Sequence, residues 1–303
     1  MPVATVSTSP RSLGPEARAA VLAWFDARGR ALAFRQTRDP YAILVSEVMA
    51  QQTQIARVVP AWRRFLIEFP TVVDLAVASP AQVLRAWQGM GYDRRARNLH
   101  RAARTMVAQH GGRVPGSIAA LEALPGIGPY TARAVAAIAF GLPVGAVDTN
   151  VRRVLSRALG LTTPRAAEVQ AAADASVHPT RPGDWTHALM DIGATLCRPT
   201  RTECAACPLH GWCISAGSPP AKAASQTRNG SPRPAAFPTT TRWLRGRILD
   251  RLRAAHRDTW TTVTAPIGVH DAAAVDRALA ALDRDGVIER DPADPSRARL
   301  PLV

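Results

Sequence analysis

The chain of 303 residues is long enough for two or three domains, and its 47% hydrophobic content allows a substantial core. No apolar run approaches the ~18 residues that a membrane span needs, and the opening MPVATVSTSPRS lacks the basic start and apolar middle of a signal peptide. The formal net charge of +15 favours a polyanionic partner, most simply nucleic acid. We therefore expect a soluble cytoplasmic protein that has no membrane partner.

Hydrophobic periodicity predicts an all-α architecture for the first two thirds of the chain. The expected helices cover residues 15–28, 41–57, 80–87, 94–108, 118–124, 129–140, 151–159 and 166–175. Turn signals rich in Gly and Pro separate them, at residues 111–116, at Gly141 and at residues 178–184.

A second unit is expected near the C-terminus. The segment GSPPAKAASQTRNGSPRPAAFP, residues 217–238, has no apolar period and is typical of a linker. Two amphipathic helices follow over residues 241–255 and 271–289, and the closing RARLPLV is expected to form one strand. This pattern indicates a small winged-helix-like module.

All four cysteines lie in CRPTRTECAACPLHGWC, with the spacing C-x6-C-x2-C-x5-C. Such a tight cluster indicates a metal or cluster site and not disulfides. Two readings stay open. Four thiolates on one short loop suit a [4Fe–4S] cluster, whereas a zinc site with four cysteine ligands usually uses two separated C-x2-C pairs, of which only one is present here.

The stretch LPGIGPYTA, Leu124 to Ala132, has the glycines of a phosphate-binding turn but neither the lysine of a P-loop nor a preceding strand. It indicates a helix, a tight turn at Gly126 and Gly128, and a second helix whose first amides can bind a phosphate without a cationic side chain. An ordinary helix–helix turn is the alternative.

Two acidic residues stand out. Asp148 begins a helix, where Asp148 or Asn150 is expected to cap free amides; Asp148 can also take part in chemistry, and the two roles are compatible. Glu47 lies in YAILVSEVMAQQTQ, an apolar helix expected to be buried almost all round. It lies either on a narrow solvated face or in a cavity that favours its protonated form and lets it act as an acid.

Six features in this order and spacing resemble the adenine DNA glycosylases of the MutY type, within the helix-hairpin-helix glycosylase superfamily. They are ILVSEVMAQQTQIARVVP, QGMGYDRRARNLHRAA, LPGIGPYTARAVAAIAFG, VDTNVRRVLSR, HALMDIGATLC and the four cysteines. The resemblance covers about residues 15–213. It implies an all-α fold in which a six-helix barrel domain carrying the hairpin and an iron-sulfur cluster domain hold DNA and an extruded base at their cleft.

The domain boundaries expected from this resemblance are as follows. Residues 1–30 pack with the cluster domain, 31–140 form the six-helix barrel, 141–217 form the cluster domain, 218–237 are the linker and 238–303 are the winged-helix-like module.

The resemblance also implies site residues. It makes Glu47 the acid that protonates a ring nitrogen of adenine and Asp148 the carboxylate that stabilises or traps the sugar cation, as in glycoside hydrolysis. Tyr130 and Asn150 support this chemistry. The remaining implied positions are the DNA-binding residues Gln52, Thr53, Tyr92, Gly126 and Gly128, the base-pocket residues Phe34, Arg35, Ala50 and His187, and the ligands of a [4Fe–4S] cluster, Cys197, Cys204, Cys207 and Cys213.

Some positions depart from the family pattern. Phe34 stands where Trp is common, Ala50 where Leu is common, Asp93 where a second Tyr is common and His187 where Glu or Gln often contacts the adenine. Whether adenine is the only base accepted stays open. Longer family members add a Nudix-like domain that recognises 8-oxoguanine, whereas this chain resembles the shorter forms typical of actinobacteria, so the strictness of the 8-oxoguanine requirement also stays open.

The expected function is therefore base excision repair of double-stranded DNA by a monomeric, nucleoid-associated hydrolase that removes adenine mispaired with 8-oxoguanine or guanine. Relatives that also cut the backbone use a lysine at the position of Tyr130, and Lys222, the only lysine, lies in the expected linker, so we expect no efficient lyase activity. The alternatives are a thymine or uracil mismatch glycosylase of the same superfamily and a non-catalytic binder of damaged DNA.

Overall fold

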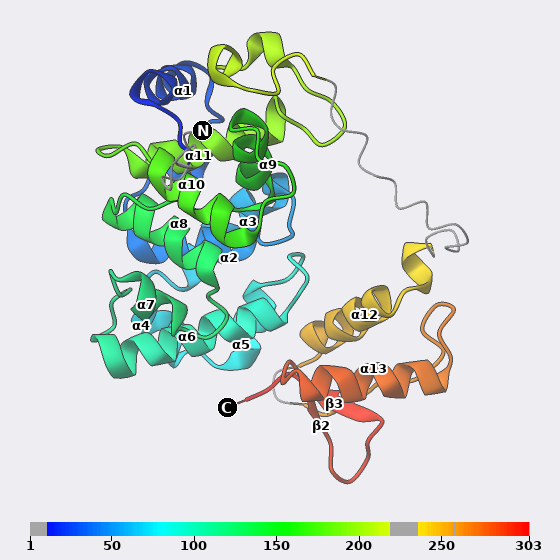
Figure 1. Ribbon diagram of the computed structural model, residues 1–303. Helices are drawn as coiled ribbons and strands as arrows, with labels where there is room; N and C mark the ends of the chain where they lie inside the picture. Colours follow the sequence, from blue (N-terminus) through cyan, green and yellow to red (C-terminus); the bar gives the residue numbers. More distant parts are fainter. Residues whose placement is uncertain (1–10, 219–235, 257–258, 303) are drawn as a thin grey trace, which may run out of the picture. The chain divides into compact units, whose positions relative to one another are not determined.

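The computed structural model describes residues 11–218, 236–256 and 259–302, whose regular secondary structure is almost entirely helical (Figure 1). The longer helices of the first two thirds are α1 (Pro15–Arg28), α2 (Pro40–Ala50), α3 (Ile55–Glu68), α6 (Arg94–His110), α8 (Pro129–Phe140), α9 (Thr149–Ala158), α10 (Ala166–Ser176) and α11 (Pro182–Thr195). The short ones are α4 (Val72–Val77), α5 (Pro80–Ala86) and α7 (Ile118–Glu122). This confirms the expected all-α class, and no helix of the described residues is long and apolar enough to cross a membrane.

The chain divides into two compact units. Unit 1 comprises residues 1–44, 116–122 and 127–229, and unit 2 comprises residues 45–115, 123–126 and 230–303. The expected domain boundaries were drawn from the family resemblance and not from contacts within the chain, and they stay a prediction. Most of the expected linker, 218–237, and Lys222 with it, lies outside the described residues.

Unit 1 is built around α11, which contacts α1, α8 and α9. Ten of its fourteen residues are buried, among them Trp185, which is only 1% exposed. A helix that is covered nearly all round must be apolar nearly all round. Its one buried acid, Asp191, is therefore a position that needs a physical explanation.

The first half of unit 2 packs α4 and α5 against α6, with α3 against α5. Its centre is aromatic: the rings of Phe65 and Trp87, both fully buried, meet edge to face with centroids 5.9 Å apart. Ser79 and Thr71 begin α5 and α4 with capping boxes, in which the side chains at both ends of the first turn satisfy free amides. The amphipathic α6 covers this core with Leu99 and Met106.

The C-terminal module consists of α12 (Thr241–Ala254), α13 (Ala272–Arg284) and a small antiparallel sheet in the order β1-β3-β2. The strands are β1 (Thr261–Thr262), β2 (Glu289–Arg290) and β3 (Arg297–Arg299), with Ala298 of β3 opposite Thr261 and Arg290. The module thus has the two expected helices and the expected strand, together with two strands that were not predicted.

The expected helix over residues 41–57 is wrong, because it is two helices separated at residues 51–54. Gln52 has a left-handed backbone with φ 53°, which no helix interior accepts. Arg95 accounts for the break, since its guanidinium donates to the carbonyls of Val48, Met49 and Gln51 that a longer helix would use. The helices α3, α4 and α11 were not predicted.

Candidate functional site

Glu47 lies on α2 in a run of nine consecutive buried residues, 41–49. The expectation of a helix buried almost all round is confirmed. Glu47 itself is 7% exposed, so it does not lie on a solvated face. A carboxyl group in such surroundings is kept only where it has partners or chemistry to perform. Ala50, the last residue of α2, is half-buried.

Asp148 caps the N-terminus of α9. The backbone N–H of Val151 donates to Asp148 Oδ1 at 2.7 Å, and Asn150 Nδ2 donates to Asp148 Oδ2 at 3.0 Å. The expected cap is therefore confirmed, and Asn150 contacts the carboxylate directly. With one donor on each oxygen, the orientation of this carboxylate is fixed.

A residue that sequence reasoning missed extends this network. Arg153 donates to Asn150 Oδ1 at 2.8 Å and to the carbonyl of Gly193 at 2.7 Å, while its Nε donates to the carbonyl of Cys197 at 2.7 Å. A chain of hydrogen bonds thus runs from the cysteine loop through Arg153 and Asn150 to Asp148. Nothing in the sequence NVRRVL distinguishes Arg153 from its neighbour Arg152.

Tyr130 occupies the first turn of α8, directly after Pro129. It is half-buried, and its hydroxyl lies 3.7 Å from Met190 Sδ on α11. This contact connects α8, which carries Tyr130, to α11. A phenol has no amine that could attack a sugar carbonyl carbon.

The expected base-pocket residues Phe34 and Arg35 lie on the short 3-10 helix η1 (Ala33–Arg35), and Phe34 is buried. Arg35 NH1 and NH2 donate to the two oxygens of Asp191 at 2.8 and 2.7 Å. Arg30 adds its Nε and its backbone N–H to the same carboxylate. Burial acts to raise the pKa of Asp191, but these hydrogen bonds and charges outweigh it and hold the pKa below its usual value.

His187, the fourth expected base-pocket residue, lies one turn before Asp191 on α11 and is 7% exposed. Burial, assisted by the charge of Arg35, lowers the pKa of His187 to about 3. The imidazole is therefore neutral at physiological pH, with its ring 6.3 Å from that of Phe25. Asp191 was missed by sequence reasoning, although a single acid within the apolar run ALMDIGA is the same signal that singled out Glu47.

The glycine turn between α7 and α8 gives its two glycines different constraints. Gly126 has φ 79°, and a Cβ there would lie 2.6 Å from Asn98 Cβ, so both conformation and space require glycine. Gly128 is the N-cap of α8 with an extended backbone, and a Cβ there would meet nothing within 4 Å. Open space at a helix N-terminus is what an approaching phosphate needs.

Three of the expected DNA-binding residues, Gln52, Thr53 and Tyr92, lie in unit 2. Gln52 and Tyr92 are exposed, and both have left-handed backbones, with φ 53° and 49°. Thr53 is half-buried and accepts a hydrogen bond from Arg95 NH2 at 3.0 Å. Arg95 also lies 5.4 Å from the centroid of the Tyr92 ring, so one half-buried arginine supports both segments that carry these residues. Sequence reasoning placed Arg95 on the helix expected over residues 94–108 but missed this role.

The four cysteines are free thiols that line one hollow in unit 1, together with the side chains of Leu196 and Thr202. No three His, Cys, Asp or Glu side chains in the described part of the chain are arranged to hold a single metal ion. Burial raises the pKa of Cys207 to about 11, so its thiolate form needs a cationic partner. Four thiols around one hollow fit a polynuclear cluster, in which each iron takes one sulfur.

Comparison with known proteins agrees with this geometry. Residues 45–179 match the model of the HhH-GPD superfamily base excision DNA repair proteins. The adenine DNA glycosylase of Mycobacterium tuberculosis is 40% identical over 279 residues, which cover 89% of each chain. That of Mycolicibacterium smegmatis is 39% identical over 89% of this chain and 92% of its own. The human adenine DNA glycosylase is 41% identical over 65% of this chain and 38% of its own.

Solved structures share the fold of about two thirds of the chain. A thermostable thymine-DNA glycosylase aligns with a TM-score of 0.61 at 28% identity, covering 65% of this chain and 93% of that one. A trapped endonuclease III–DNA covalent intermediate aligns with a TM-score of 0.57 at 26% identity, covering 66% and 93%. The fold is therefore that of the helix-hairpin-helix glycosylases, and the mycobacterial relatives extend over both units. The chain belongs to the adenine DNA glycosylase family of this superfamily.

Proposed function

We propose that the protein hydrolyses the N-glycosidic bond of adenine mispaired with 8-oxoguanine or guanine in double-stranded DNA. The observation that carries the proposal is the environment of its two carboxyl groups. Glu47 is buried in an apolar helix, whereas Asp148 is held by one hydrogen-bond donor on each oxygen. Glycoside hydrolysis needs two carboxyl groups whose surroundings differ in this way.

In this mechanism Glu47 donates a proton to a ring nitrogen of the extruded adenine, which turns the base into a neutral leaving group. The C–N bond breaks, and positive charge develops on the sugar. The Asp148 carboxylate, oriented by Val151 and Asn150, stabilises that charge until water adds to the sugar carbon, and the proton that water loses restores the acid form of Glu47. The products are free adenine and an abasic site.

A second candidate is release of thymine or uracil from mismatches, which the likeness to the thymine-DNA glycosylase structure favours. Base release from duplexes that carry adenine, thymine or uracil opposite each of guanine, cytosine and 8-oxoguanine separates the two. The first proposal requires adenine to be released fastest. Preferential release of thymine or uracil would favour the second candidate over the first. Intact DNA binding without release of any base would indicate a non-catalytic binder of damaged DNA.

We propose further that the protein leaves the DNA backbone intact. Tyr130 has no amine to form a Schiff base with the sugar, and Lys222 lies outside every motif. Borohydride trapping is expected to capture little protein on DNA. Efficient capture that is lost in Lys222→Gln would contradict this assignment.

Cys197, Cys204, Cys207 and Cys213 are proposed to hold a [4Fe–4S] cluster, whose role would be to order the loop that carries them. Arg153 would then transmit that order to Asn150. Anaerobically purified protein is expected to be brown and to contain about four irons per chain. A colourless protein with one zinc would refute the cluster.

A further inference from the structure

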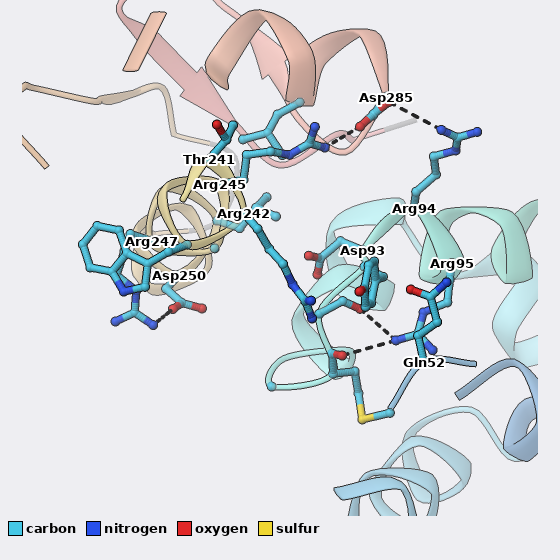
Figure 2. A pocket seen from close by; sticks show the side chains of 18 of the residues that line it. Gln52, Asp93, Arg94, Arg95, Thr241, Arg242, Arg245, Arg247, Asp250 and Asp285 are labelled. Atoms are coloured by element: carbon cyan, nitrogen blue, oxygen red, sulfur yellow. Dashed lines mark hydrogen bonds and ion pairs between the residues drawn. The ribbon is translucent and has the colours of Figure 1, made fainter. Parts of the chain in front are cut away.

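A groove of about 790 Å³ lies within unit 2, between α12 of the C-terminal module and the segments around Gln52 and Tyr92 (Figure 2). Seven arginines and three aspartates line it. The family resemblance assigns no role to the module, and the mechanism proposed above does not use it. The groove is nevertheless a concave surface with more arginines than aspartates, and such a surface attracts a ligand of opposite charge.

The module is held to this site by buried contacts. Arg253 pairs with Asp93, and their side chains are only 6% and 12% exposed. Arg253 also donates to the carbonyl of Leu84 at 3.0 Å, and Arg97 donates to that of Asp285 at 2.9 Å. Buried charged pairs are costly to break, so the groove has two fixed walls. Asp93, which departs from the family pattern, thus has a structural partner in the module.

Four of the lining arginines share the three carboxylates, so their charge is balanced only in part. Arg245 and Arg94 face Asp285, and Arg247 pairs with Asp250 at 2.6 Å while staying 55% exposed. Arg57 and Arg242 are exposed and form no ion pair with a carboxylate in the described part of the chain. The groove therefore keeps an excess of positive charge that its own carboxylates do not balance.

Arg242 links the two walls. Its guanidinium carbon lies 4.2 Å from the centroid of the Tyr92 ring, and Figure 2 shows its side chain extending from α12 towards the segment of Asp93. Cation–π contact at this distance stabilises both groups. Arg242 of the module thereby holds the side chain of Tyr92, one of the expected DNA-binding residues, in place.

The backbone at this wall is strained. Of the three non-glycine residues with positive φ in the described residues, two, Gln52 and Tyr92, line the groove. Such conformations cost free energy and persist where the surrounding structure enforces them, which is common at ligand sites. Arg95 enforces them by donating to the carbonyls of Gln51 and Gly91 at 2.5 and 3.0 Å.

We infer that α12 is the second wall of a DNA-binding groove, in which Arg242 and Arg247 contact backbone phosphates while Tyr92 and Gln52 face the bases. The inference rests on the proposed DNA substrate. Its chemistry is that of phosphate recognition: guanidinium groups bind phosphate oxygens with paired hydrogen bonds, and an aromatic ring beside them stacks on a base. The module thus takes part in substrate binding and is not only an appendage.

The test uses the full chain and two double variants of equal charge change. R242Q/R247Q removes two cations from the groove, whereas R251Q/R277Q removes two exposed arginines of the same module that do not line it. Affinity for a duplex with one adenine–8-oxoguanine pair is measured across a salt series. Each lost phosphate contact should reduce the slope of log affinity against log salt by about 0.9. The groove variant loses two contacts, so its slope should be smaller by about two, and it should bind the duplex about tenfold or more weakly.

The matched control should change affinity by less than about twofold, and thermal unfolding should show that both variants stay folded. If the two double variants behave equally while the wild type binds the duplex and releases adenine, the proposed role of the groove is wrong and the proposed function stands. Wild type that binds but releases no adenine would overturn the function, while the salt slopes still decide the groove. Wild type that does not bind the duplex would overturn both.

Discussion

Two regions of the molecule hold the candidate site residues in opposite ways. In unit 1, Asp148, Asn150 and Asp191 are fixed by hydrogen bonds from neighbouring donors, and Asp191 is fully buried. In unit 2, Tyr92 is 39% exposed on a left-handed backbone, beside the exposed side chain of Arg242. The difference follows the tasks proposed for them, because bond cleavage needs charges of fixed orientation, whereas duplex binding needs exposed rings and cations.

The largest effect is expected where the fixed carboxylate is removed. Asp148→Asn should abolish adenine release, a loss of roughly 10³-fold or more in the single-turnover rate, because an amide cannot stabilise the sugar cation. Its Oδ1 can still accept the N–H of Val151, so the helix cap and DNA affinity should be largely retained. Glu47→Gln is the companion variant, with an expected loss of roughly 10²- to 10⁴-fold. Near-normal release by either variant would show that the two carboxyl groups are not the catalytic pair.

Arg153→Ala sharpens the comparison, since it breaks the hydrogen-bond chain without touching Asp148. It removes the donors to Asn150, Gly193 and Cys197, and the expected cost is about 2 kcal/mol or more of unfolding free energy together with at least a tenfold slower release. The matched control is Arg152→Ala, since within the described residues Arg152 donates only to the carbonyl of Pro164, at 3.2 Å. Denaturant unfolding and single-turnover release measure both effects. If the two substitutions have equal effects, the hydrogen-bond chain through Arg153 does not support Asp148.

The two glycines of the turn separate folding from binding. Gly126→Ala should lower the unfolding free energy by about 1–3 kcal/mol, because φ is 79° and Asn98 occupies the space of a new Cβ. Gly128→Ala, with φ −93° and open space, should change stability by less than about 0.5 kcal/mol but weaken duplex binding severalfold by obstructing the helix N-terminus. Melting curves and binding isotherms of both variants check this. The reverse pattern would contradict the roles given to the two positions.

Close to neutral pH, the smallest effect is expected from the pH dependence of stability. The pKa of His187 is about 3 in the folded protein and about 6.5 when unfolded, so between these values only the unfolded chain binds the proton. Unfolding free energy should be fully retained above pH 6.5 and fall below it, by at most about 1.4 kcal/mol per pH unit. His187→Gln, which cannot take up this proton, should show a shallower fall.

Urea unfolding of wild type and His187→Gln between pH 4 and pH 7 measures the difference in slope. Other groups, such as Asp191 beside Arg30 and Arg35, contribute equally to both proteins and cancel in the comparison. Parallel curves would mean that His187 takes up a proton in the folded state.

Local patterns in the sequence predicted much of the first region. Helix α8 has the predicted bounds, 129–140, because Pro129 and Gly141 mark its ends. The cap at Asp148 followed from its position at a helix start, and in the second region the burial of Glu47 followed from its apolar neighbours. The adenine chemistry itself came from the family resemblance, since such patterns indicate where a carboxyl group lies and not which base it serves.

The second region depends on contacts that a local pattern does not contain. The break at residues 51–54 is stabilised by Arg95, which lies 44 residues from Gln51 in the sequence, and the groove depends on the pair of Arg253 with Asp93, 160 residues apart. Helix propensity favours glutamine within a helix, so the run QQTQ gave no sign of the break. Tertiary hydrogen bonds overrode it, and they do so beside the strained residues Gln52 and Tyr92.

The most direct test of the account follows a duplex with a single adenine opposite 8-oxoguanine, incubated with excess enzyme and analysed with and without alkali treatment. The account predicts free adenine, strand breaks only after alkali, and neither product with Asp148→Asn. Strand breaks without alkali, or release by Asp148→Asn at the wild-type rate, would contradict it.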